Sequence, residues 1–433
     1  MSSRLAFAWA LALSCVSFAA AQDRLHAFVG ARLIPIEGDP IEHGVLLVRD
    51  GKILKIGSRD NLEVPGDALV HEAAGKVILP GLVCTHSHIG GPSGGDRSAP
   101  IQPEVRVLDS LDVRDTSVRK ARAGGITTVN VMPGSGHLIS GQTLYLKLRN
   151  GQSIDDLLIK DDQGRPSGGL KMANGTNSRR DPPFPGTRGK SAALVREKFI
   201  QAREYQAKIE RAEGNPEKLP ARDLGLEILV EALKGQRVVH HHTHRHDDIL
   251  TVLRLREEFG FQVVLHHVSD AWMVADQIAA ARVPCSIIVL DSPGGKLEAK
   301  DIDWRNGAVL EKAGVPVSFH TDDPITDSRL FLRSAALAVR AGMSRPAALE
   351  AMTLAGAKML GLDNRTGSLV PGKDADFIVL SGDPLSTYTQ VLETYVEGVR
   401  VFDRSDPEDK LMAVGGYGAG TPRDRGLCCF GND

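Results

Sequence analysis

Histidines are grouped in this sequence at spacings that suit a metal ion. Ten of the 14 histidines fall in three stretches, which are His86 with His88, the region from His240 to His267, and His320. In a strand, side chains two positions apart leave from the same face, so His86 and His88 can bind one ion together. Imidazole ligands favour a divalent ion such as Zn²⁺, which activates water for hydrolysis.

A denser group of five histidines lies between residues 240 and 246, directly after a strand-like apolar pair. Alternate residues of a strand share a face, so only every second histidine of this group points the same way. Within this group we predict that His242 and His244 face the site together, because they lie beyond the strand body. We expect His241 and His246 to be solvated or packing residues. The alternative interpretation is a surface tract that scavenges metal.

Two later strand-like segments also end in side chains that bind metals. Because neighbours in a strand point to opposite faces, one of His266 and His267 should be a ligand and the other should support it. His320 and Asp322 share a face at the end of a further segment. A carboxylate at that place can bind a metal and take a proton from water, so we predict that Asp322 is the catalytic base.

The elements that must position these residues alternate along the chain. Between residues 80 and 365, short apolar runs such as Ile126–Val131 are followed by helix-length amphipathic segments such as Asp247–Phe259. Such repeats predict an α/β fold of the (β/α)₈ TIM-barrel type, in which the strand ends carry the active site. A doubly wound sheet is the structural alternative, but no Gly-x-Gly-x-x-Gly follows an early strand.

Sheet-forming segments flank the alternating region at both ends. Residues 27–79 contain short alternating runs with turn signals, and a similar stretch follows residue 376. We predict a small composite β-sandwich domain from residues 22–79 and 366–433, with the barrel at 80–365. Residues 178–223, rich in Arg, Pro and Lys, are expected to be an insertion or a long loop.

The N-terminus is typical of a targeting signal. Arg4 precedes the apolar run Leu5–Phe18, which closes on three alanines ending at Ala21. We therefore expect a signal peptide over residues 1–21, cleaved near Ala21, and a periplasmic or secreted mature protein with no membrane segment. The cysteine spacing predicts no disulfide framework.

Charge and composition limit the kinds of partner. The chain has 52 Lys and Arg against 54 Asp and Glu, a formal charge of −2, and 42% hydrophobic residues. Such a balance provides no field that would attract nucleic acid. We expect a small-molecule substrate and no nucleic-acid partner, and homo-oligomer formation stays open.

Taken together, the motifs resemble those of the amidohydrolase superfamily, in the branch related to imidazolonepropionase and Xaa-Pro-type dipeptidases. The resemblance covers nearly the whole mature chain and implies the same barrel and β-sandwich. The motifs that carry it are Leu79-Pro-Gly-Leu-Val-Cys-Thr-His86-Ser-His88, Gly125-Ile-Thr-Thr-Val, His242-Thr-His244-Arg-His-Asp-Asp-Ile, Leu265-His-His267, His320-Thr-Asp322 and Gly367-Ser-Leu-Val-Pro-Gly-Lys-Asp-Ala-Asp-Phe-Ile-Val-Leu.

The resemblance also implies roles for individual residues. One or two Zn²⁺ ions are expected, with Lys171 carboxylated so that it bridges them, and the alternative for Lys171 is an ordinary pairing with a carboxylate. Cys84 and His266 stand where relatives carry acidic residues. The implied metal ligands are His86, His88, Lys171, His242, His267 and Asp322. The residues that we expect to contact substrate are His137, His244, Arg245 and His320.

We therefore predict a metal-dependent hydrolase that acts on carbon–nitrogen bonds of a small molecule or dipeptide. These bonds can be peptide bonds or other amide-type bonds. A metal-activated water attacks an amide-type carbon, and Asp322 passes the proton to the leaving nitrogen. Two alternatives stay open. One is a hydrolytic deaminase of a heterocycle with one metal, and the other is a metal-binding barrel without catalysis.

Overall fold

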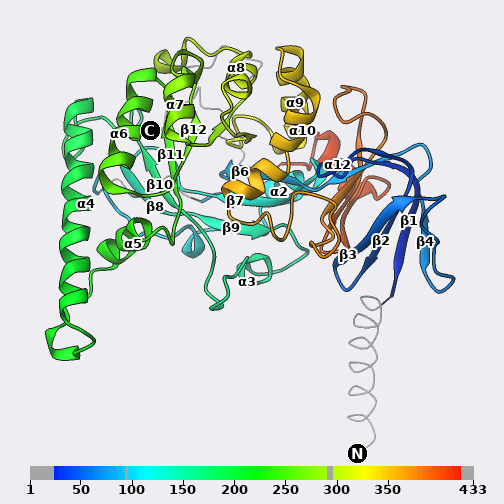
Figure 1. The fold of residues 1–433 in the computed structure, drawn as a ribbon, viewed down its shortest axis with the longest axis horizontal. Helices are drawn as coiled ribbons and strands as arrows, with labels where there is room; N and C mark the ends of the chain where they lie inside the picture. Colours follow the sequence, from blue (N-terminus) through cyan, green and yellow to red (C-terminus); the bar gives the residue numbers. More distant parts are fainter. Residues whose placement is uncertain (1–23, 93–95, 97, 290–295, 421–433) are drawn as a thin grey trace, which may run out of the picture.

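The computed structural model describes residues 24–92, 96, 98–289 and 296–420. It shows a mixed α/β fold in which helices surround mostly parallel strands, and a second group of strands lies to one side (Figure 1). The predicted signal peptide, residues 1–21, lies outside the described residues. Within the described ranges, no helix combines the length and the apolar character that crossing a bilayer requires.

The two terminal segments meet in one eight-stranded sheet. Strands β5 and β15 pair antiparallel with Leu79 opposite Ile378, which joins the N-terminal and C-terminal segments. Asp50 and Gly51 form the turn between β2 and β3 at positive φ, as a two-residue hairpin requires. The strands are β1 (His26–Leu33), β2 (Ile41–Arg49), β3 (Lys52–Ser58), β4 (Leu69–Glu72), β5 (Val77–Pro80), β15 (Phe377–Leu380), β16 (Val391–Val396) and β17 (Val399–Asp403).

This sheet has the order β17-β16-β15-β5-β1-β2-β3, and β4 pairs with β1. The N-terminal and C-terminal segments therefore share one sheet, while the composite β-sandwich domain of residues 22–79 and 366–433 stays a prediction.

The remaining strands form two further sheets. One has the order β14-β13-β12-β11-β10-β8 and is parallel except for β8, and the other has the order β6-β7-β9. Their strands are β6 (Leu82–Ser87), β7 (Ile126–Val131), β8 (Ile139–Gln142), β9 (Leu144–Lys147), β10 (Leu170–Ala173), β11 (Val239–Thr243), β12 (Val263–His267), β13 (Cys285–Ile287) and β14 (Val317–Phe319).

These two sheets are connected at both of their ends. Strand β8 runs into β9 with one residue between them, and at the other end β14 lies against β6. The backbone N–H of Asp322, just after β14, donates a hydrogen bond to the carbonyl oxygen of His86 (3.0 Å). Because continuous strand pairing stops at these two places, the closed barrel also stays a prediction.

Helices follow most of the parallel strands. They are α2 (Thr116–Ala123), α3 (Ile154–Leu157), α4 (Arg188–Arg211), α5 (Leu224–Leu233), α6 (His246–Phe259), α7 (Ala275–Ala281), α8 (Asn306–Lys312), α9 (Phe331–Arg340), α10 (Arg345–Ala351), α11 (Leu354–Met359) and α12 (Pro407–Val414). Short 3₁₀ turns are η1 (Val107–Asp109), η2 (Pro216–Lys218), η3 (Ala271–Met273), η4 (Leu297–Ala299) and η5 (Ser328–Leu330).

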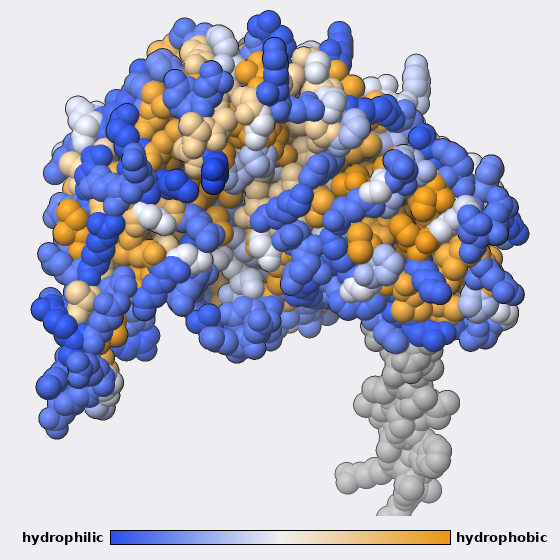
Figure 2. Space-filling view, viewed as in Figure 1, coloured by the Kyte–Doolittle hydropathy of each residue, from blue (hydrophilic) through white to orange (hydrophobic). Residues whose placement is uncertain are grey.

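The expected loop at residues 178–223 is largely helical, which corrects the prediction. Helix α4 begins after Thr187, whose side chain accepts from the Lys190 N–H. One narrow face is buried, and on it Phe199 stacks 5.2 Å from Phe261. The other faces carry charged residues, and the projecting end of α4 is mostly hydrophilic (Figure 2). The periodicity is weak in the sequence because so few positions of this long helix are apolar.

A buried ion-pair cluster joins the terminal sheet to the sheet that carries β9. Lys147, at the end of β9, is fully buried and contacts the carboxylates of Asp374 (3.0 Å) and Asp376. These aspartates directly precede β15 and come from the closing motif of the sequence. Burial of a charge is costly without a partner, so this cluster constrains how the two parts of the chain pack.

Candidate active site

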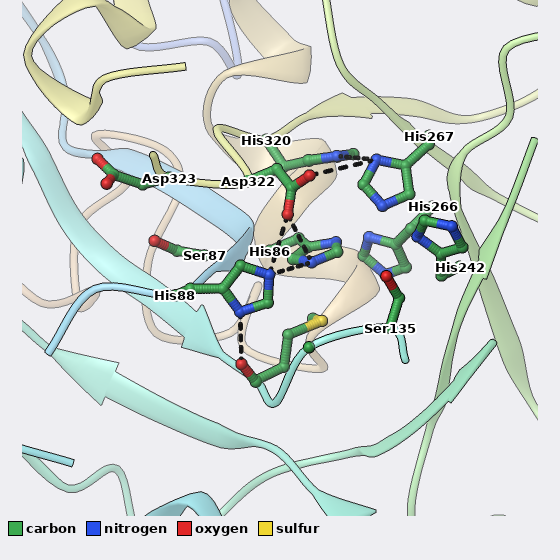
Figure 3. A network of polar contacts seen from close by, with 12 residues as sticks. His86, Ser87, His88, Ser135, His242, His266, His267, His320, Asp322 and Asp323 are labelled. Carbon is green, nitrogen blue, oxygen red and sulfur yellow. Dashed lines mark hydrogen bonds and ion pairs between the residues drawn. The ribbon is translucent and has the colours of Figure 1, made fainter. Parts of the chain in front are cut away.

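Two histidines and one carboxylate converge at the junction of β6 and β14. Asp322 Oδ1 lies 3.2 Å from His86 Nε2 and 3.0 Å from His88 Nε2, and the two Nε2 atoms are 3.4 Å apart (Figure 3). One ligand atom from each of the three residues lies within 4.8 Å of the others, which fits a metal ion. The structure therefore brings together the first three predicted ligands.

The surroundings of His86 and His88 favour metal binding. His88 Nδ1 donates to the carbonyl oxygen of Met132 (2.7 Å), which directs its Nε2 toward Asp322. Such a second hydrogen bond typically sets the orientation of a ligating imidazole. Burial, followed by the charge of Lys171, holds the pKa of His86 well below its usual value. The imidazole of His86 is therefore neutral, as a metal ligand must be.

Asp322 is ionised in this setting. Burial alone would raise the pKa of its carboxyl, but the adjacent imidazoles of His267 and His88 outweigh it, and the pKa falls well below its usual value. The residue has a positive φ of 50°, which turns the chain directly after His320 and Thr321. Asp323 instead accepts hydrogen bonds from the N–H and the hydroxyl of Ser328, the first residue of η5, whose N-cap is Asp327.

Lys171 lies on β10 with its amine inside the site. Its side chain is fully buried, and Nζ is 3.2 Å from His86 Nε2 and 3.1 Å from Met132 Sδ. Burial lowers the pKa of Lys171 to about 7, although Asp322 opposes this change. Among the described residues Lys171 has no ion pair with a carboxylate, so the alternative of an ordinary paired lysine has no support in the geometry.

The remaining predicted ligands, His242 and His267, have adjacent rings with centroids 4.4 Å apart. The two histidines nevertheless belong to different groups of side chains that could each hold one ion. His267 groups with His86 and His320, whereas His242 groups with His244 and Glu298. The pairing of His242 and His267 around a second ion stays a prediction.

The expectation that His266 and His267 point to opposite faces is wrong. The His86 ring lies 5.1 Å from the ring of His266 and 4.9 Å from that of His267, so both approach the same centre. His267 has a φ of 69° and Val268 a φ of 42°, which end the strand and turn the His267 side chain inward. His266 contacts His240 (2.9 Å) deeper in the strands. The alternation of side chains holds only while the backbone remains extended.

The four predicted substrate contacts occupy different surroundings. His320 is fully buried, with Nδ1 at 2.7 Å from Ser286 Oγ and Nε2 at 3.1 Å from His267 Nδ1. His244 is buried beside His242 and His267.

The other two predicted contacts lie elsewhere. Arg245 precedes α6 and pairs with Asp247 (2.9 Å). His137 is buried with its Nε2 at 2.6 Å from the carbonyl oxygen of Asp96. Contact with substrate by these four residues stays a prediction.

The fold of this chain recurs in a protein of known structure. A solved amidohydrolase from Thermotoga maritima is 34% identical to this chain with a TM-score of 0.81, covering 87% of this chain and 100% of that one. The chain belongs to the amidohydrolase superfamily. A model of the amidohydrolase family also matches residues 208–402.

Curated relatives agree with this membership. The imidazolonepropionase of Deinococcus radiodurans is 28% identical over 83% of this chain and 92% of its own length. The amidohydrolase tasK of Hapsidospora irregularis is 28% identical over 83% of this chain, which spans 40% of that relative's length. The predicted family and the prediction of a hydrolase acting on carbon–nitrogen bonds are therefore confirmed.

The donor set of this amidohydrolase fits the divalent ion that its superfamily uses. Neutral imidazoles and an ionised carboxylate converge in a buried place, and among the described residues His86 Nδ1, His242 Nδ1 and His267 Nε2 have no hydrogen-bond partner. The imidazole and carboxylate donors are those typical of Zn²⁺ and related transition ions.

Three residues that sequence reasoning did not single out lie beside the histidines of this amidohydrolase. Asn177 Nδ2 donates to Ser135 Oγ (2.7 Å) and lies 3.5 Å from His242 Nε2, which brings the segments that follow β7 and β10 together beside the histidines. Glu298, in η4, is only 6% exposed. The sequence offered one signal that Glu298 could belong to the site, which is its position after the strand-like run that begins at Cys285. Loops that follow barrel strands supply site residues.

Proposed function

We propose that this amidohydrolase hydrolyses an amide-type carbon–nitrogen bond in a small molecule or dipeptide, with Zn²⁺ as the divalent ion. The observation that carries the proposal is the convergence of His86 Nε2 and His88 Nε2 on one oxygen of Asp322, at 3.2 and 3.0 Å. When bound, the ion would provide a water that ionises near neutral pH and a Lewis acid for the substrate carbonyl.

The residues of the chain supply the proton transfer and the orientation of ligands. Asp322 accepts the proton of the attacking water and delivers it to the leaving nitrogen, which becomes a good leaving group only when protonated. Lys171, neutral at slightly alkaline pH, can react with carbon dioxide to form a carbamate, and a carbamate bears the negative charge that an ammonium lacks. His320 positions His267 through the 3.1 Å contact between their nitrogens.

The test of this proposal is a hydrolysis screen with and without metal. The purified protein is loaded with Zn²⁺ and assayed on N-acyl amino acids, dipeptides and cyclic ureides, before and after treatment with a chelator. We expect turnover on one of these classes, its loss after chelation and its loss in His88→Gln. The variant His43→Asn changes an exposed histidine of β2 at positive φ and should match the wild type. Turnover that survives both chelation and His88→Gln would contradict the proposal.

We also propose that β6 to β14 form one closed (β/α)₈ barrel, in which β8 and β9 together occupy one of the eight strand positions, and that the terminal sheet belongs to a β-sandwich domain. The hydrogen bond from Asp322 N to His86 O and the direct passage from β8 to β9 support closure. An experimental structure in which these edges carry continuous strand pairing, with a second β-layer on the terminal sheet, is the expected result.

Export is a further part of the proposal. The apolar run Leu5–Phe18 after Arg4 and the three alanines up to Ala21 support cleavage of a signal peptide and a periplasmic or secreted enzyme. Expression of the full chain, followed by N-terminal sequencing of the exported fraction, should identify Gln22 as the first residue. An uncleaved N-terminus on protein that stays inside the cell would contradict this proposal.

A further inference from the structure

We propose that His266 is a positioning residue that donates a hydrogen bond from Nδ1 to an oxygen held at the metal centre, and that Tyr145 fixes this direction through His240. The three side chains lie in a row that runs from β9 through β11 to β12. The role of His266 in the reaction rests on the proposed function, whereas the positions of the protons along the row do not.

Two hydrogen-bonding contacts connect the row. Tyr145 Oη lies 2.9 Å from His240 Nε2, and His240 Nδ1 lies 2.9 Å from His266 Nε2. Tyr145 is 4% exposed and both histidines are fully buried, so solvent does not compete for the contact between the two rings. The ring of His266 in turn lies 5.1 Å from the ring of His86, among the side chains of the centre (Figure 3).

Each member of the row carries one polar hydrogen. Burial lowers the pKa of His240 to about 3 and holds the pKa of His266 well below its usual value, so both imidazoles are neutral. A neutral imidazole has one N–H and one bare nitrogen. Burial also raises the pKa of the Tyr145 hydroxyl, which therefore keeps its proton.

The tyrosine decides the direction in which these hydrogen bonds run. Among the described residues, His240 is the partner of Tyr145 Oη, so the O–H finds an acceptor only when it donates to His240 Nε2. His240 then carries its proton on Nδ1 and donates to His266 Nε2, and His266 carries its proton on Nδ1. In the opposite direction the buried hydroxyl hydrogen would have no acceptor, which is costly.

The last N–H of the row, at His266 Nδ1, is left to the centre. This nitrogen is buried and has no hydrogen-bond partner among the described residues, although buried polar atoms are normally paired. His266 also belongs to none of the groups of described side chains that could hold one ion, and a nitrogen that carries a proton cannot bind a metal. In the proposed reaction the attacking water and the amide carbonyl bring oxygen acceptors to this centre, and His266 orients one of them.

The experiment locates the protons directly and needs no substrate. The Zn²⁺-loaded protein is labelled with ¹⁵N in its histidine rings, and long-range proton–nitrogen correlation spectra show which ring nitrogen carries hydrogen. The variants His240→Gln and His266→Gln assign the signals. Tyr145→Phe removes the hydroxyl from the row. The matched control is Tyr205→Phe, which removes the hydroxyl of a buried tyrosine of α4 that contacts Glu227 (3.4 Å).

We expect the proton on Nδ1 of both His240 and His266 in the wild type and in Tyr205→Phe. In Tyr145→Phe a second form should appear, with the His266 proton on Nε2. A wild-type His266 that carries its proton on Nε2 would overturn the proposal, and so would a spectrum that is the same with and without the Tyr145 hydroxyl. The spectra decide this point even where no substrate is turned over, so the proposed function can fail separately.

The role in the reaction has its own readout. On a substrate identified by the hydrolysis screen, kcat of Tyr145→Phe should fall about 10-fold while KM stays unchanged, because an outer partner of the centre is lost without loss of a binding contact. Tyr205→Phe should match the wild type in both constants. An unchanged kcat in Tyr145→Phe, together with the altered proton positions, would overturn the role of His266 in catalysis.

Discussion

The backbone N–H of Asp322 donates to the carbonyl oxygen of His86, with 3.0 Å between nitrogen and oxygen. This bond joins the first and last strands of the mostly parallel set at the level of the histidines. It also places the Asp322 carboxylate within 3.2 Å of both imidazoles, His86 and His88. The base and its neighbouring ligands are therefore positioned by the backbone as well as by their side chains.

Replacing the Asp322 carboxylate should remove both proton transfer and metal binding. In Asp322→Asn we expect kcat/KM to fall by about 10²–10⁴-fold, which is the usual contribution of general acid–base catalysis, with a further loss at limiting metal. Steady-state kinetics over a range of Zn²⁺ concentrations separate the two effects.

The neighbouring residue provides the control. Asp323 faces Ser328 and not the metal ligands, so Asp323→Asn should bind metal normally and lose about 1 kcal/mol of stability because its hydrogen bonds to Ser328 weaken. Equal catalytic losses in the two variants would show that Asp322 has no special role.

Lys171 should carry a carbamate whose formation increases with pH. Only the neutral amine reacts with carbon dioxide, and burial lowers the Lys171 pKa to about 7, so the reactive fraction rises between pH 6 and pH 8. In ¹³C-bicarbonate, NMR of the metal-loaded protein should show a carbamate resonance that weakens toward pH 6. The resonance should be absent in Lys171→Met and retained in Lys160→Met, where an exposed lysine is changed. A carbamate resonance that persists in Lys171→Met would show that a different residue carries the carbamate.

The buried cluster around Lys147 should contribute strongly to stability. In Lys147→Met the buried carboxylate of Asp376 loses its cation and Asp374 keeps only its more exposed partners Lys52 and Arg365, so we expect a loss of about 3–5 kcal/mol in the free energy of unfolding. Lys52 also contacts Asp374 (2.6 Å) but is about half-exposed, so Lys52→Met should cost about 0–1 kcal/mol. Urea titrations at neutral pH measure both values. Similar costs would mean that burial does not decide the strength of these pairs.

The same cluster predicts how stability depends on pH. Burial raises the pKa of Asp374, but Lys147 and Lys52 outweigh it and the pKa is lowered on folding. A carboxyl whose pKa is lowered stabilises the fold above its unfolded pKa of about 3.9, and this contribution is lost as the pH falls through the folded value. The stability gap between the wild type and Asp374→Asn should therefore narrow below about pH 4. A gap that stays constant from pH 7 to pH 3 would contradict this account.

Gly169 should tolerate no side chain because it directly precedes β10 and packs closely against the start of β11. A Cβ at this position would lie 2.3 Å from His240 Cδ2 and 2.6 Å from the Val238 carbonyl oxygen. We expect Gly169→Ala to cost about 1–3 kcal/mol of stability and to weaken metal binding, since it displaces the strands that carry Lys171 and His242. Gly66→Ala, where nothing lies within 4 Å, is the matched control in thermal melts and metal titrations.

Several features of the site could be predicted from local patterns. The spacing of His86 and His88 and the position of Asp322 after a strand are properties of short segments, and the structure brings these three together as expected. The composite sheet followed from runs at both ends of the chain. Helix α4 was missed because its few apolar positions are separated by charged residues.

The sequence by itself determined which side chains can bind a metal and on which strand ends they lie, because strand alternation and amphipathic periodicity are local. Only the tertiary structure decided which of them meet. The positive φ of His267 turned two adjacent histidines toward one centre, and η4 brought Glu298 beside His242 and His244. Such encounters depend on backbone turns and on packing between distant segments, and neither leaves a periodic signal along the chain.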